Sequence, residues 1–168
     1  MRMARDDFCN SCGTQYADTS GYPRACASCG AHVWANPVPV VVLLVPVKDG
    51  PRTGLLTVRR AIPPVGQLAF VSGFMDRGES WQQSAARELM EEAGVAVDPD
   101  ELRPLHFVST PDGATVLLFA TAPAVNVEDM PRFVPNDEAS ERKVIFECEP
   151  LAFPLHNEVA TKYFSTEQ

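Results

Sequence analysis

Three glutamates stand at helical spacing near the middle of the chain. Glu88, Glu91 and Glu92 occupy positions i, i+3 and i+4, which brings side chains of one helix within about 5 to 6 Å of each other. Like charges at that distance repel by about 1 kcal/mol in water, and the adjacent Arg87 compensates only one of them. Carboxylates on a rigid element are typical ligands of Mg²⁺ or Mn²⁺. We therefore predict a divalent-cation site here, and a solvated acidic helix face is the alternative.

The segment that must position these acids has helix signals at both ends. Ser80, followed three residues later by Gln83, forms a capping-box pattern, and Gly94 stands where helices commonly end in a left-handed residue. The spacing predicts a helix from Trp81 to Ala93. Its predicted core-facing arc lies opposite the acids and consists of Ala85, Ala86, Leu89, Met90 and Ala93.

The acids also belong to a longer pattern with nine fixed positions: Gly73, Glu79, Arg87, Glu88, Leu89, Glu91, Glu92, Gly94 and Val95. This pattern matches the motif of the Nudix hydrolases at every specified position, so the chain resembles that family. Two departures lie before the motif. Val71-Ser72 stand where many members have Pro-Gly, and Leu68 stands where many have Trp. Neither change touches a carboxylate, but Ser72 restricts the loop that presents Gly73 more than a glycine would.

The resemblance implies an α/β/α sandwich with a mixed sheet, in which a loop, the helix and a second loop form the metal site. Glu79 would pair with Arg87 and brace the loop against the helix. The implied activity is hydrolysis of a nucleoside diphosphate linked to another group, with release of a nucleoside monophosphate. Carried over by position, the metal ligands would be the Gly73 carbonyl, Glu88, Glu91 and Glu92.

Two further places carry charged residues that could meet a substrate. Arg59 and Arg60 are adjacent at the end of a predicted strand, where a guanidinium can bind a phosphate or simply be solvated. Residues 122–140 form a long segment with three prolines, and Nudix members often place an additional acid here that helps to activate water. Glu138 or Glu141 fits that role, and a solvated loop acid is the alternative.

The N-terminal segment 1–34 contains two CxxC pairs, each followed by a glycine that permits a tight turn: Cys9 and Cys12 before Gly13, Cys26 and Cys29 before Gly30. The stretch between the two pairs is long enough for a short hairpin, which suits a tetrahedral Cys₄ zinc site. Two disulfides are the alternative, but we expect no secretion signal, and a segment this short needs a metal for its stability. Four thiolates leave no open position, so the predicted zinc is structural.

Composition predicts one ordinary domain behind this zinc ribbon. The chain has 168 residues, of which 45% are hydrophobic. No apolar run is long enough to span a membrane, so we expect a cytoplasmic protein without a membrane segment. A net charge of −8 argues against a large nucleic-acid footprint. Charges in the segment 1–34 balance, which favours a structural or homodimer-forming ribbon over a nucleic-acid-binding one. The predicted domains are residues 1–34 and 35–168.

An apolar run and turn residues predict the strands of the second domain. The apolar run 38–45 reads as a buried strand, and Gly50-Pro51 and Asp112-Gly113 mark turns. Cys148 has no partner near it in sequence, and none of His32, His106 and His156 has ligand spacing, so structural roles are predicted for them. A terminal amphipathic helix is expected after Pro150. The predicted strands are 38–45, 54–60, 105–109, 115–121 and 143–147.

With a ribbon in front and a Leu151-Ala152-Phe153 turn near the end, the chain resembles zinc-ribbon Nudix proteins of the class that includes ADP-ribose, FAD and NADH pyrophosphatases. That resemblance implies metal-assisted substitution at phosphorus, with Mg²⁺ or Mn²⁺ as catalytic cofactor and a small nucleotide as partner. The sequence does not determine which of ADP-ribose, FAD, NADH, nucleoside triphosphates and capped RNA is the substrate. A non-catalytic ligand sensor or a nucleic-acid adaptor is the alternative, against which the intact acids count.

Overall fold

The computed structural model describes residues 7–166. The chain forms two compact units, Met1–Pro37 and Val38–Gln168, and the predicted domain boundary after residue 34 stays a prediction. The first unit contains a small antiparallel pair, β1 (Arg24–Ala25) and β2 (His32–Val33). In the described part of the chain, no helix is long and apolar enough to cross a membrane.

The second unit is built on two sheets. One sheet has the order β10-β4-β5-β11, with β6 paired to β5, and the other has the order β7-β3-β9-β8. β3 pairs parallel to β9, and β10 parallel to β4, while the other neighbours are antiparallel, so the predicted mixed pairing is confirmed. The strands are β3 (Val38–Leu44), β4 (Pro46–Asp49), β5 (Arg52–Arg60), β6 (Leu68–Ala69), β7 (Val71–Phe74), β8 (Arg103–Ser109), β9 (Thr115–Thr121), β10 (Val125–Asn126) and β11 (Ala139–Ile145).

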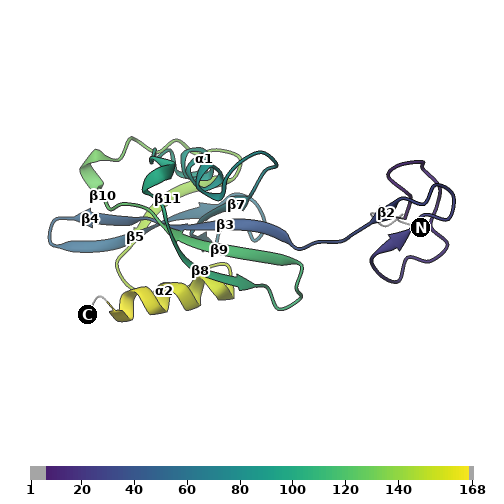
Figure 1. Ribbon diagram of the computed structural model, residues 1–168. Helices are drawn as coiled ribbons and strands as arrows, with labels where there is room; N and C mark the ends of the chain where they lie inside the picture. Colours follow the sequence, from purple (N-terminus) through teal and green to yellow (C-terminus); the bar gives the residue numbers. More distant parts are fainter. Residues whose placement is uncertain (1–6, 167–168) are drawn as a thin grey trace. The chain divides into compact units, whose positions relative to one another are not determined.

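Two helices cover opposite faces of these strands (Figure 1). Side chains of a strand alternate between faces, and β3 shows the consequence. Val41 and Leu43 join the core under α1 (Trp81–Ala93), whereas Val42 and Leu44 join the core under α2 (Pro154–Thr166). Two cores on either side of the strands make an α/β/α sandwich, as predicted. Two short 3₁₀ turns, η1 (Pro99–Glu101) and η2 (Val127–Asp129), complete the unit.

Some sequence-based boundaries and burial predictions differ from the structure. β11 begins at Ala139, earlier than the predicted start at Lys143, because it follows β5 up to Arg60. On α1, Met90 was predicted to face the core but is 49% exposed. Glu88 and Glu92 were predicted on the polar face, yet they are only 7% and 4% exposed. The polar face of α1 is therefore partly covered, and what covers it defines the candidate site.

Candidate functional site

The helix α1 that carries the acids is capped at both ends. Ser80 Oγ accepts a hydrogen bond from the Gln83 backbone N–H at 3.2 Å, and Gln83 Oε1 accepts one from the Ser80 N–H at 2.8 Å. Gly94 adopts φ 68°, and its N–H donates to Met90 O at 3.0 Å. The capping box and the left-handed end are those predicted from the sequence, and they determine at which residues α1 begins and ends. The acids are thus held on one defined face.

Three carboxylates converge beside this helix. Glu88 and Glu92 come from α1, and Glu138 comes from the loop before β11. One carboxylate oxygen from each residue lies within 4.8 Å of the other two. The group lines a cavity of about 360 Å³ to which Arg60 and Gly73 also contribute. Glu88, Glu92 and Glu138 are called the acid cluster below.

Burial perturbs the acids of this cluster. It raises the pKa of Glu92 to about 8, although the Ser72 N–H donates to Glu92 Oε2 at 3.2 Å and acts in the opposite direction. Burial raises the pKa of Glu88 as well. Buried carboxylates that repel each other need a proton or a cation as compensation. An oxygen-only donor set with both charge and space fits Mg²⁺ or Mn²⁺.

Arg87 ties the loop before α1 to the helix. Its Nε lies 2.9 Å from Glu79 Oε1, and its Nη1 lies 2.7 Å from Glu88 Oε1 and 3.0 Å from Glu91 Oε2. Hydrogen bonds from Arg87 lower the pKa of Glu79 to about 2, so this acid stays ionised. Arg87 contacts two of the helix glutamates, so its single charge is shared between Glu88 and Glu91, and Glu91 stays outside the acid cluster.

The two adjacent arginines have different surroundings. Arg59 Nε lies 2.6 Å from Glu141 Oε2, and Arg59 Nη1 donates to Gly66 O at 2.9 Å. Neither residue of the Arg59–Glu141 pair lines the cavity, whereas Arg60 and Glu138 both do. Of the alternatives that the sequence left open, the structure brings Arg60 and Glu138 to the acids and leaves Arg59 and Glu141 aside.

Asn136 is a residue of this site that sequence reasoning missed. Its Nδ2 donates to the α1 carbonyl of Glu91 at 2.8 Å, and its Oδ1 accepts from the N–H groups of Glu138 at 3.0 Å and Ala139 at 2.8 Å. The side chain therefore fastens the loop to the helix and places Glu138 among the acids. An asparagine that opens a polar turn before a strand is the available signal, since Asn side chains bond the backbone two residues on.

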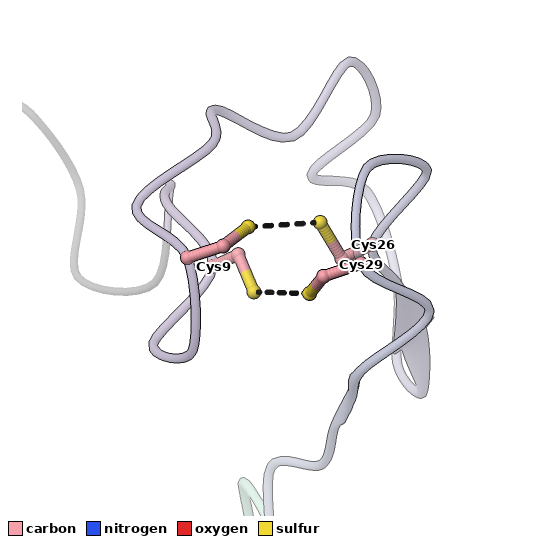
Figure 2. A group of neighbouring side chains, drawn as sticks. Cys9, Cys26 and Cys29 are labelled. Atoms are coloured by element: carbon pink, nitrogen blue, oxygen red, sulfur yellow. Dashed lines mark hydrogen bonds between the residues drawn. The ribbon is translucent and has the colours of Figure 1, made fainter.

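The four cysteines of the first unit also converge (Figure 2). Cys9 and Cys29 have sulfurs 3.7 Å apart, and those of Cys12 and Cys26 are 3.6 Å apart. A disulfide requires about 2.0 Å, and all four cysteines are free. Thiolates at about 2.3 Å from one tetrahedral zinc would lie about 3.8 Å apart. The observed distances match zinc ligation and not disulfide formation.

Each CxxC pair turns back at the glycine that follows it. The N–H of Gly13 donates to Cys9 O at 2.8 Å, and the N–H of Gly30 donates to Cys26 O at 2.8 Å. Both glycines have left-handed φ values of 73° and 74°, which side chains with a Cβ rarely adopt. The two knuckles are built alike, and each presents its sulfurs to the other pair (Figure 2).

Comparison with known proteins assigns the second unit. A family model described as NUDIX domain matches residues 37–165, more than half of the chain. The chain belongs to the Nudix family. Among curated relatives, it is 34% identical over 93 residues to the NAD-capped RNA hydrolase NudC of Deinococcus radiodurans. It is 36% identical over 93 residues to the mitochondrial NAD(P)H pyrophosphatase NUDT13 of Mus musculus.

These matches cover 54% of this Nudix chain, but only 32% and 25% of those two relatives. Solved structures extend the likeness in fold. A NUDIX hydrolase from Nitrosomonas europaea superposes with a TM-score of 0.72 at 23% identity, over 95% of this chain and 90% of that one. The NUDIX domain of NrtR from Shewanella oneidensis, complexed with ADP ribose, gives 0.63 at 20% identity, over 79% and 89%. At these identities the likeness concerns the fold alone.

The burial of Glu92 on the Nudix helix predicts how the stability of the cation-free protein depends on pH. Folding raises the pKa of Glu92 to about 8 from about 4.3 in the unfolded chain. The folded state then binds more protons between these values, so the free energy of unfolding falls as pH rises through that window. Buried His156, whose pKa is lowered to about 3, acts oppositely, but it adds only about 0.4 kcal/mol above pH 6.5, where the unfolded imidazole loses its remaining proton. From pH 6.5 to 8 we expect a loss of about 1 to 2 kcal/mol.

Urea unfolding at several pH values in this range, after removal of weakly bound cations, measures the effect. Glu92→Gln is the matched variant, because an amide does not titrate, and its stability should change much less over the same range. A wild-type profile that is flat or rises between pH 6.5 and 8 would contradict the assignment of a raised pKa to Glu92.

Gly73 of the Nudix motif lies directly against Glu88. A Cβ added at this position would overlap the Glu88 carboxylate group. The overlap is with the far end of a flexible side chain, so we expect Gly73→Ala to displace the carboxylate and not to unfold the domain. Because Glu88 is a predicted metal ligand, turnover should fall by at least about tenfold, since a displacement of about 1 Å is costly at a reacting centre. The steady-state rate and the melting temperature of the variant test this.

Gly21→Ala is the control for this substitution, because an added Cβ there meets nothing within 4 Å. It should leave turnover unchanged. Normal turnover of Gly73→Ala would show that the position of Glu88 is not critical. A large fall in its melting temperature would show that the backbone, and not the carboxylate, had moved.

Proposed function

We propose that this Nudix domain hydrolyses the pyrophosphate bond of a nucleoside diphosphate linked to another moiety and releases a nucleoside monophosphate. The observation that carries the proposal is the acid cluster, which meets Arg60 and Gly73 around a cavity of about 360 Å³. Burial of Glu88 and Glu92 together costs desolvation free energy, which a purely structural helix would avoid with apolar residues. Binding energy for a cation and a diphosphate offsets that cost.

Mg²⁺ or Mn²⁺ is the proposed cofactor, held by Glu88 and Glu92 with support from Glu91 and the Gly73 carbonyl. When bound, such a cation supplies charge stabilisation for the oxygens around the attacked phosphorus. Glu79 and Arg87 brace the loop that carries Gly73, as their 2.9 Å ion pair supports. They position the ligands without meeting the substrate.

Glu138 is the proposed proton acceptor. It is exposed at the cavity, whereas Glu88 and Glu92 are buried, so it can meet a water that attacks phosphorus. Asn136 holds its backbone at 3.0 Å, which restricts the loop while the carboxylate stays accessible. Arg60 is the proposed partner of a substrate phosphate. We do not extend that role to Arg59, because Glu141 occupies it.

The substrate class proposed is of the ADP-ribose, FAD or NADH type. The names of the relatives support it, since they act on NAD-capped RNA or NAD(P)H, and a related fold was solved with ADP ribose. The test is a panel of these three compounds, a capped RNA and nucleoside triphosphates with Mg²⁺ or Mn²⁺, followed by product mass. Release of a nucleoside monophosphate from one of the linked diphosphates is the expected result. Binding without turnover of any compound would favour a ligand sensor.

We further propose that the first unit is a structural zinc ribbon. The four sulfurs lie at distances suited to one tetrahedral ion. A unit with only two very short strands in its described part has little core of its own, so metal binding supplies folding free energy. Because four thiolates close the coordination sphere, hydrolysis is assigned to the Nudix unit alone.

A further inference from the structure

Two buried side-chain polar atoms lack a hydrogen-bond partner among the described residues, Arg60 Nε and His156 Nδ1. Such atoms are rare in folded proteins, and each costs about 1 to 3 kcal/mol. The two are chemically complementary. Arg60 Nε–H is always a donor, while an unprotonated imidazole nitrogen is an acceptor. His156 is neutral at pH 7, because burial and then the charge of Arg60 lower its pKa to about 3.

Both side chains meet at the ring of Phe153. The guanidinium carbon of Arg60 lies 5.0 Å from the ring centroid, and the imidazole centroid of His156 lies 5.0 Å from it in an edge contact. Phe153 precedes α2 and His156 belongs to its first turn, where the His156 N–H donates to Phe153 O at 3.0 Å. The start of α2 therefore contacts the arginine that lines the acid cavity.

The charge of Arg60 affects the pKa values of both Glu92, in the acid cluster, and His156, in α2. It opposes the rise in the pKa of Glu92 and contributes to the fall in that of His156. A ring that only filled space among Phe70, Phe119 and Phe153 would be expected to be apolar, because a buried nitrogen without a partner is costly. The imidazole is therefore explained by its polar neighbour and not by the aromatic core.

We propose that His156 and Phe153 are positioning residues that hold the Arg60 guanidinium in the cavity, where it binds an anionic group of the substrate. The inference rests on the proposed function. Two contacts define the guanidinium: the ring face of Phe153 and the Pro63 carbonyl that accepts from Nη2 at 2.6 Å. The proposal adds a third, in which the unprotonated Nδ1 of His156, packed on the same ring, accepts from Arg60 Nε–H directly or through a water. One water between the last two atoms would satisfy both.

A double-mutant cycle tests the link. His156→Phe keeps an aromatic ring of similar size but removes Nδ1, and Arg60→Met removes the guanidinium. His106→Phe is the control, because that histidine also packs on Phe119, at 6.2 Å, but is exposed and has no ring contact with Phe153 among the described residues. The readouts are the dissociation constant of α,β-methylene-ADP with Mg²⁺ by calorimetry, and KM and kcat for ADP-ribose.

Arg60→Met should weaken analogue binding by at least about tenfold, the scale of a lost charge-assisted hydrogen bond. His156→Phe should weaken it and raise KM by about three- to tenfold with little change in kcat. In the Arg60→Met background, His156→Phe should change neither constant. His106→Phe should leave all of them unchanged.

An equal effect of His156→Phe in both backgrounds, or none in either, overturns the proposal. Phe153→Leu serves as the second variant if His156→Phe does not fold, with the same expected dependence on Arg60. Wild-type protein that binds the analogue but hydrolyses none of the linked diphosphates of the panel would remove the proposed function, while the binding cycle would still decide the link. If the analogue does not bind, the cycle is read from unfolding free energies, where additive effects of the two substitutions overturn it.

Discussion

Glu92→Gln should lower turnover with Mg²⁺, measured on the linked diphosphate that the panel identifies as substrate, by at least about a hundredfold, the scale of losing a group that acts electrostatically in the transition state. Glu92 is 4% exposed, and its carboxylate oxygen lies within 4.8 Å of those of Glu88 and Glu138. An amide in its place keeps the shape but removes a charge that a cation needs. Glu91→Gln should cost less, because Glu91 lies outside the acid cluster and pairs with Arg87.

Stability separates this effect from misfolding. In the cation-free protein Glu92 must take up a proton on folding, because its pKa rises to about 8, and an amide avoids that cost, so the melting temperature of the cation-free variant should equal or exceed that of the wild type. Glu101→Gln, in η1 and exposed, is the control and should keep full turnover. Near-normal turnover of Glu92→Gln with an intact fold would remove the helix α1 from the catalytic assignment.

Local signals in the sequence predicted α1 well because both of its ends are determined within a few residues. Ser80 and Gln83 satisfy each other's backbone groups, and Gly94 supplies the left-handed residue. The direction in which the helix faces is not local. Met90 satisfies the apolar pattern yet is exposed, and Glu92 breaks it yet is buried, because the strands and the loop before β11 decide what covers the helix.

The composition of the acid cluster shows the same limit. Spacing along α1 predicted Glu88, Glu91 and Glu92 as one group. In the structure, Glu91 pairs with Arg87 and lies outside the acid cluster. The third member of the cluster is Glu138, from a loop far beyond α1 in the sequence. The position of Glu138 depends on the pairing of β11 with β5 and on Asn136, whose side-chain amide donates a hydrogen bond to the carbonyl of Glu91. Contacts between residues that are far apart in the sequence depend on tertiary packing, and a local sequence pattern does not predict them.

The four cysteines of the proposed zinc ribbon illustrate the opposite case. Two CxxC pairs and their glycines predicted the approach of four sulfurs, because each knuckle is closed by local hydrogen bonds from Gly13 and Gly30. The choice between zinc and disulfides depended on the expected compartment and on the shortness of the segment, and sulfur separations of 3.6 and 3.7 Å favour the metal.

The prediction with the largest expected energy concerns this zinc. The purified protein should contain about one zinc per chain, and Cys26→Ser should lose it and unfold the first unit. Structural zinc contributes about 10 to 16 kcal/mol of apparent binding free energy in small fingers, and Cys26 is 3% exposed, so no water readily replaces its sulfur. Elemental analysis and the NMR spectrum of the ribbon residues measure both changes. Cys148→Ser is the control, since that exposed cysteine lies outside the sulfur cluster.

The same preparation tests whether the two metals act separately. The ribbon offers soft thiolates that select zinc, and the acid cluster offers hard oxygens that select Mg²⁺ or Mn²⁺. Brief EDTA treatment should abolish turnover, and added Mg²⁺ should restore it while zinc stays bound, because exchange from a closed Cys₄ site is slower than loss of a water-rich cation. If restoration required zinc and Mg²⁺ had no effect, hydrolysis would not depend on the acid cluster. Because the two sites belong to separate compact units, Cys26→Ser should also leave the response of the Nudix unit to Mg²⁺ intact.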